Sequence, residues 1–178
     1  MPKAEERVFL TQESLDGVYN FHDTFLNASL LKKALEYTQI PDDPLEFFTS
    51  DRGRFERLWA GALYVLVEAW RSHAWRMARV YIEDRFETTA LREILKLGEK
   101  TGNIALLKDA RHYMFHRDKR GYWDRGREAP IGRVEYNLSL HEEFGTVLLA
   151  AMKAANSEYK SLGLLPPVVY SSLPPRKG

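Results

Sequence analysis

Apolar residues recur at steps of three and four along most of this chain, which is the spacing of one face of an α-helix. The first such stripe consists of Val18, Phe21, Phe25, Ala28, Leu31 and Leu35. The last stripe, in a helix expected from about Val134 to Tyr159, consists of Leu140, Phe144, Val147, Leu148, Ala151 and Ala155. No segment alternates convincingly as a β-strand, so the pattern predicts an all-α protein.

Helix boundaries are marked by prolines and capping residues. Pro41 and Pro44 interrupt the pattern after the first helix, because proline disrupts a helix interior. A second helix is expected to begin near Ser50 or Asp51, both of which can cap a helix N-terminus. Residues 58–67 are apolar nearly all round, so we expect this helix to be the central one of the fold.

The middle of the chain has shorter patterns. Residues 74–87 are interpreted as a partly helical connection, followed by a short helix from about Thr88 to Lys100 that Gly102 ends. Asn103 can cap the next helix, which is expected to cover residues 104–118.

These elements together predict an up-and-down helical bundle of about five helices in one domain, residues 1–162, with Trp59 and Trp70 as core residues. Residues 119–133 are rich in glycine and are expected to form a loop. Residues 163–178 contain two Pro-Pro pairs and are expected to form an extended or disordered tail.

Composition restricts the class of protein. Apolar residues make up 44% of the chain, which is enough for a proper core, and there is no cysteine for disulfide or thiolate chemistry. Residues 1–10 lack an apolar signal core. The longest apolar run, residues 58–70, is too short to span a bilayer and contains Glu68. We therefore expect a soluble, cytoplasmic protein that does not enter a membrane.

Charge is distributed unevenly although the formal net charge is only +1. Residues 1–50 hold four Lys or Arg against nine Asp or Glu, whereas residues 111–133 hold seven Lys or Arg against three acids. A concentrated basic segment attracts phosphates more than the total charge would suggest.

The segment 108–123, KDARHYMFHRDKRGYW, combines this charge with two histidines. His112 and His116 are four residues apart, on one exposed side of the helix, while Arg111 lies at the margin of the apolar face. Arg111 and His116 are separated by about 140° around an ideal helix. A long arginine side chain, a frayed last turn or a second copy of the helix would be needed to aim both at one point.

Three interpretations of this segment are open. The first is structural, because histidines and basic residues favour a helix C-terminus, where they complement the helix dipole. The second is a metal site at His112 and His116, with His141 or Glu142 as a third ligand. The third is phosphate chemistry, in which histidine moves protons and arginine clamps the phosphate.

Phosphate chemistry would also use the residues that follow the histidines. Basic side chains contact a nucleic-acid backbone, and aromatic rings stack on unpaired bases. The residues expected to bind such a substrate are Arg117, Lys119, Arg120, Tyr122, Trp123 and Arg125.

The stretch LLKDARHYMFHRDK resembles the signature of the HEPN superfamily: an arginine, a polar residue, three to five further residues and a histidine, near the end of a late helix. In this chain the matching residues are Arg111, His112 and His116. FERLWAGALYVLVEAWR also resembles the apolar, glutamate-containing helix of some small bacterial HEPN-like proteins, so the resemblance covers about residues 54–119. Asp118 departs from one toxin subgroup, which has a tyrosine there, and no sensor or nucleotidyltransferase domain is recognisable.

The resemblance implies an all-α bundle that forms a homodimer through the 103–117 helix, so that two motifs line one groove. It implies His116 as the proton-transfer residue, Arg111 as the phosphate-contacting group and His112 as the polar second member. The activity implied is a metal-independent endoribonuclease of a defence or toxin type, which leaves a 2′,3′-cyclic phosphate, needs no cofactor and is controlled by an antitoxin or regulatory protein. The alternative is a catalytically inactive helical interaction module that binds RNA or a protein partner.

Glu68 interrupts an apolar run and therefore needs a partner or exposure to water. One interpretation is a structural ion pair with Arg71 or Arg76. The other is a supporting role, in which Glu68 reaches Arg111 or a motif histidine and fixes its orientation.

Overall fold

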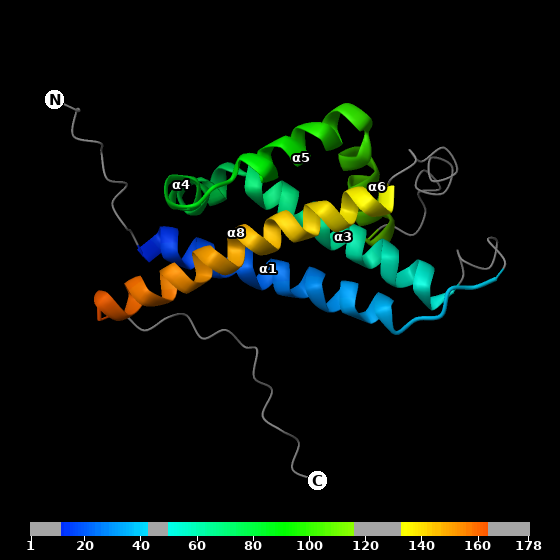
Figure 1. Ribbon diagram of the computed structural model, residues 1–178, viewed down its shortest axis with the longest axis horizontal. Coiled ribbons are helices and arrows are strands. Elements are labelled where there is room, and N and C mark those ends of the chain that lie inside the picture. The colour runs from blue at the N-terminus through cyan, green and yellow to red at the C-terminus, as the bar shows by residue number, and fades with distance from the viewer. Residues whose placement is uncertain (1–11, 43–49, 116–132, 164–178) are drawn as a thin grey trace, which may run out of the picture.

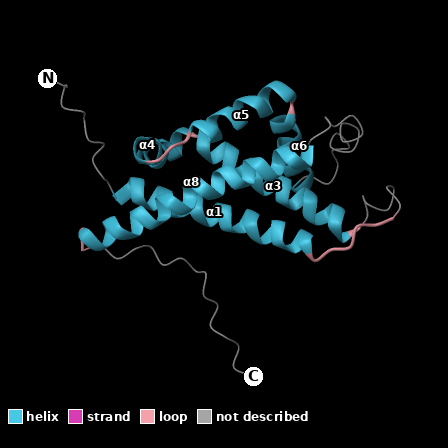
Figure 2. Cartoon of the chain, in the orientation of Figure 1, coloured by secondary structure: helices cyan, strands magenta, loops and turns pink. Residues whose placement is uncertain are grey.

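The computed structural model describes residues 12–42, 50–115 and 133–163, and the side chains of residues 113–115 are not among the described atoms. Within these ranges 89% of the residues are helical and none lies in a strand (Figures 1 and 2). The predicted all-α class is therefore confirmed for the described part of the chain.

Three long helices form the main layer of the fold. They are α1 (Gln12–Glu36), α3 (Asp51–Arg71) and α8 (Arg133–Ser161). Three shorter helices, α4 (Arg76–Arg85), α5 (Thr89–Thr101) and α6 (Asn103–Phe115), connect and cover them, and a 3₁₀ turn, η1 (His73–Trp75), precedes α4. In Figure 1, α4 lies toward one end of the long helices and α6 toward the other.

Contacts at both ends of α1 fix the directions of the long helices. Arg52 donates a hydrogen bond from Nη1 to the Leu35 carbonyl oxygen at 2.9 Å, whereas Phe21 packs on Trp70 with ring centroids 5.7 Å apart. The C-terminus of α1 therefore lies beside the N-terminus of α3, and the two helices are antiparallel. The contact of Phe25 with His141, with ring centroids 4.9 Å apart, and that of Tyr19 with Asn156 make α8 antiparallel to α1 as well.

The core lies between these three helices. Trp59 and Trp70 are 2% and 4% exposed, which confirms both as core residues. The residues of the two apolar stripes predicted from the sequence are also buried there, except for the half-buried Leu31; examples are Val18, Phe21, Leu140, Phe144 and Leu148. Burial of these stripes, rather than intrinsic helix propensity, provides most of the stability of such helices.

Capping residues set the helix ends largely as predicted. Ser50 is the N-cap of α3, and its side-chain oxygen accepts a hydrogen bond from the Gly53 backbone N–H at 3.2 Å. Gly102 follows α5 with a φ of 80°, in the left-handed region that glycine adopts without a Cβ penalty.

Residues 76–85 differ from the prediction, because they form a regular helix rather than a partly helical connection. Ser72 adopts an extended conformation and its side chain accepts from the Ala74 N–H, which starts η1 and leads into α4. Ala78, Tyr81 and Ile82 then bury one short face. The described chain therefore has six α-helices where about five were expected.

No helix within the described ranges is both long and apolar enough to cross a membrane. Of the predicted loop at 119–133, residues 119–132 lie outside the described residues, and Arg133 is the first residue of α8 rather than part of a loop. Of the predicted tail at 163–178, residues 164–178 lie outside the described residues.

Candidate functional site

Arg111 lies where α6 crosses α3, and it is held by two α3 side chains. Its Nη1 atom is 2.6 Å from Oε2 of Glu68, and its guanidinium carbon lies 5.8 Å from the centroid of the Tyr64 ring. The Arg111 and Glu68 side chains are 33% and 49% exposed, so the pair remains in contact with water. Tyr64 and Glu68 are four residues apart on α3, which places them on one face, one turn apart.

The structure identifies the ion-pair partner of Glu68, on which both interpretations of this residue depend. Arg71, the structural partner considered above, pairs instead with Glu99 of α5 at 2.7 Å. Glu68 contacts Arg111, as the supporting role requires. Whether this contact serves a functional site stays a prediction.

The face of α6 that carries Arg111 is the face that the bundle leaves open. Between residues 105 and 112, Leu106, Leu107 and Ala110 are buried. Ala105 and Lys108 are exposed, and Asp109, Arg111 and His112 are half-buried. The exposed and half-buried residues occupy a continuous sector of about 160° on an ideal helix. We call these five residues the α6 open face.

Three basic side chains lie on the α6 open face: Lys108, Arg111 and His112. Lys108 lies three residues from Arg111 and four from His112, so the three side chains are neighbours on the helix surface. Glu68 offsets part of this charge, as does Asp109, whose Oδ2 atom is buried. The face therefore combines a guanidinium, an ammonium and an imidazole, which are groups that contact phosphate.

Several predicted site residues lie outside the described ranges. These are His116, Arg117, Lys119, Arg120, Tyr122, Trp123 and Arg125. The predicted pairing of Arg111 with His116 is thus not tested, whereas Arg111 and His112 do lie on the same open face.

Arg133, which belongs to the basic segment 111–133, already forms an ion pair. Its Nη2 atom donates a hydrogen bond to Oε1 of Glu56 at 2.7 Å, and the two side chains are 21% and 13% exposed. This largely covered ion pair anchors the first residue of α8 to α3. Arg133 is therefore committed to the fold and is not a free cation for a substrate.

His141 is committed to the core and is not available as a metal ligand. Its Nδ1 atom accepts a hydrogen bond from Trp59 Nε1 at 3.3 Å, and its Nε2 atom lies 3.3 Å from Ser29 Oγ. Burial lowers the pKa of His141 to about 4, and the charge of Lys32 adds to this effect. Among the described residues, no three His, Cys, Asp or Glu side chains form a group that could hold a metal ion. The metal interpretation therefore loses His141 as its third ligand.

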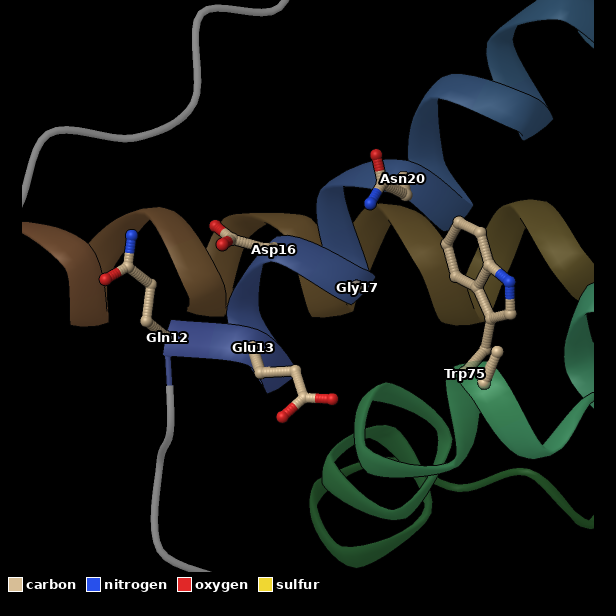
Figure 3. Close-up of a pocket in the computed structure, with 7 residues that line it drawn as sticks. Gln12, Glu13, Asp16, Gly17, Asn20 and Trp75 are labelled. Carbon is tan, nitrogen blue, oxygen red and sulfur yellow. The ribbon is translucent and has the colours of Figure 1, made fainter.

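A separate hollow of about 500 Å³ lies between the first turns of α1 and the η1 turn. Figure 3 shows Glu13, Asp16 and Asn20 projecting from α1, with the Trp75 indole across from them. Asp16 accepts a hydrogen bond from the Tyr159 hydroxyl. The described residues that line the hollow include carboxylates and no basic side chain, so the hollow is unsuited to phosphate.

Tyr64, Lys108 and the hydrogen-bond network of His141 were not predicted from the sequence as parts of these sites. Tyr64 and Lys108 belong to no recognisable motif, and only the crossing of α3 and α6 brings Tyr64 to Arg111.

Compared with protein-family models, curated proteins and solved structures, the chain shows no significant match.

Proposed function

We propose that this chain is a HEPN-like, RNA-binding protein with an up-and-down bundle topology that cleaves RNA at a composite site built from two copies of α6. The observation that carries the proposal is the ion pair of Arg111 with Glu68 on the α6 open face. It holds an arginine at the surface next to Lys108 and His112, where a phosphate can reach it.

A homodimer accounts for an open helix face in this position. In a two-fold dimer the same surface meets its own copy. Exposed Ala105 is small enough for a second helix to approach closely, whereas Lys108 and Arg111 are too costly to bury and would line a groove. Two copies of Arg111 and His116 would then face one groove, which removes the requirement that one helix aim both residues at one point.

The chemistry that we propose is transesterification within RNA. The 2′-oxygen attacks the adjacent phosphorus, the bond to the 5′-oxygen breaks, and a 2′,3′-cyclic phosphate remains. One His116 imidazole would take the proton of the 2′-hydroxyl, and the second would protonate the leaving 5′-oxygen. Arg111 would stabilise the negative charge of the phosphorane, and His112 would hold Arg111 or the substrate.

The basic and aromatic residues between 117 and 125 would bind the flanking nucleotides through phosphate contacts and base stacking. An antitoxin or another regulatory protein that covers the α6 open face would control the activity in the cytoplasm. A catalytically inactive module would use the same surface only to bind RNA or such a partner.

Cleavage of single-stranded RNA by the full-length protein in the presence of EDTA tests the proposal. We expect products with 2′,3′-cyclic phosphate ends, and loss of cleavage in the variants Arg111→Ala and His116→Ala with unchanged far-UV circular dichroism. His73→Ala, at an exposed histidine of η1, is the matched control and should retain activity. Unchanged cleavage by Arg111→Ala or His116→Ala would remove the assigned site. RNA binding without any product would indicate the inactive module.

A further inference from the structure

Arg111 remains partly accessible to a ligand although it is paired with Glu68, since its side chain is 33% exposed. An arginine side chain has five N–H donors in a planar fork. Among the described residues, the only acidic group paired with this fork is Glu68, which lies at Nη1, and the Tyr64 ring lies against the guanidinium. A phosphate can therefore bind the opposite edge of the fork without displacing Glu68.

An anion bound in this way feels the carboxylate of Glu68 as well as the guanidinium. With Glu68 at 2.6 Å from Nη1, a phosphate on the far edge would have its phosphorus about 7 Å from the carboxylate, given ordinary hydrogen-bond lengths. The positive charges of Lys108 and Arg111 are matched in number by the negative charges of the half-buried Asp109, on the same face, and of Glu68, on α3. The charges of these four described residues therefore sum to about zero, and an additional negative charge on the ligand gains little from them.

The charge of the ligand differs between the two kinds of phosphate in RNA. An internal phosphodiester carries one negative charge, whereas a phosphomonoester carries about −1.5 to −2 at pH 7. Repulsion from Glu68 grows in proportion to the ligand charge. The carboxylate therefore penalises a terminal phosphate or a free nucleotide about twice as strongly, in free energy, as an internal linkage.

We propose that Glu68 is a specificity-determining residue of the Arg111 site, which shifts the selectivity of the site away from a phosphomonoester and toward an internal phosphodiester. This inference rests on the proposed function, because it requires that Arg111 binds the phosphate of RNA. Tyr64 is a positioning residue in the same arrangement, since its ring lies against the guanidinium, with the guanidinium carbon 5.8 Å from the ring centroid.

The test is a titration of the full-length protein with two probes that differ in phosphate charge. The 2′-deoxy form of uridylyl-uridine, called UpU here, has one phosphodiester and lacks the 2′-hydroxyl that would attack it, and 2′-deoxyuridine 3′-monophosphate has one phosphomonoester. Both dissociation constants are measured at pH 7.5 and low salt by NMR for the wild-type protein, for Glu68→Gln and for Asp51→Asn. Asp51 is the matched control, because its exposed carboxylate also pairs with an arginine, Arg54, on the same helix. It lies about 25 Å from Glu68 along the helix axis.

Glu68→Gln is expected to lower the dissociation constant of UpU about threefold and that of the monophosphate about tenfold. The free-energy gain is proportional to the ligand charge, so the factor for two charges is the square of the factor for one. Asp51→Asn is expected to change neither constant by more than the error. Equal gains for the two probes, no gain for either, or a wild-type protein that binds neither probe at millimolar concentration would overturn the inference.

Arg111→Ala separates this inference from the proposed function. If Arg111→Ala abolishes RNA cleavage and weakens UpU, but Glu68→Gln leaves the ratio of the two constants unchanged, only the role of Glu68 is wrong. If Arg111→Ala leaves both cleavage and UpU binding unchanged, Arg111 does not bind phosphate and both proposals fail. Circular dichroism of each variant establishes that the helical fold is retained.

Discussion

Trp59 donates a hydrogen bond from its indole Nε1 to the Nδ1 atom of His141, across 3.3 Å in the centre of the bundle. The acceptor role of Nδ1 places the imidazole proton on Nε2, from which it is shared with Ser29 Oγ at 3.3 Å. The Ser29 hydroxyl in turn donates to the Phe25 carbonyl oxygen at 2.9 Å. Three helices, α1, α3 and α8, are thus joined by one polar chain that requires a neutral histidine.

Stability should therefore fall as acid protonates this network. The pKa of His141 is lowered to about 4 in the folded protein, against an ordinary value near 6.5. Above pH 6.5 His141 is neutral in both the folded and the unfolded protein, so the network contributes fully to the free energy of unfolding. Between pH 6.5 and 4 the unfolded chain binds the proton first, so the free energy of unfolding should drop by up to about 3 kcal/mol. Burial also lowers the pKa of His22, which acts in the same direction.

Urea unfolding of the wild-type protein and of His141→Gln between pH 7.5 and 4 measures this effect. The variant lacks the titrating group, so its stability should depend less steeply on pH, and the difference between the two proteins should shrink as the pH falls. A difference that stays constant over this range would show that His141 does not titrate as its burial requires.

Trp59→Phe removes the donor and keeps most of the ring. His141 Nδ1 would then be a buried acceptor without its Trp59 partner, which costs about 1–3 kcal/mol in the free energy of unfolding. Trp70→Phe is the matched control, because Trp70 is also buried and packs on Phe144 at a ring-centroid distance of 6.0 Å. In the double variant Trp59→Phe, His141→Phe, the two losses should not add, since both remove one interaction. Full additivity would mean that the hydrogen bond contributes nothing.

The sequence predicted the long helices because their apolar stripes extend over many turns, as in α1 and α8. It did not predict α4, whose stripe has only Ala78, Tyr81 and Ile82 among arginines and acids. His141 was predictable as a core residue, since it lies three residues before Phe144 on the buried stripe. Because histidine is a common metal ligand, His141 was interpreted instead as a candidate ligand of a metal site.

The partner of Glu68 was beyond sequence reasoning for a different reason. Arg71, Arg76 and Arg111 were all plausible from charge alone, and the choice depends on how α6 crosses α3. That crossing is set by packing of many apolar side chains, so no local pattern encodes it. The motif located Arg111, but only the fold shows that Tyr64 and Glu68 hold it.

Gly98→Ala should destabilise the contact of α5 with α8. A Cβ atom at residue 98 would overlap the Tyr136 hydroxyl and approach Ile104 Cγ1 to 2.9 Å. Because Tyr136 is 6% exposed and has little space to move, we expect a loss of about 1–3 kcal/mol in the free energy of unfolding. Chemical denaturation measures it. Gly102→Ala tests a different effect as a comparison, since that site has open space but a left-handed φ of 80°. An unchanged stability for Gly98→Ala would mean that α5 and α8 are packed less closely.

Arg111→Lys separates the charge of the site from its geometry. Lysine keeps the positive charge but lacks the planar fork that binds a phosphate through two parallel hydrogen bonds. We therefore expect RNA binding to weaken about threefold or less, with a salt dependence close to that of the wild-type protein, because the number of cations is unchanged. Under the proposed function, RNA cleavage should fall by about a hundredfold or more, because the proposed contact of Arg111 with the transition state would be lost. Arg111→Ala, by contrast, should lower both the affinity and the slope of its salt dependence. Fluorescence anisotropy at several salt concentrations and single-turnover cleavage measure the two properties, and wild-type cleavage by Arg111→Lys would show that Arg111 acts only as a point charge.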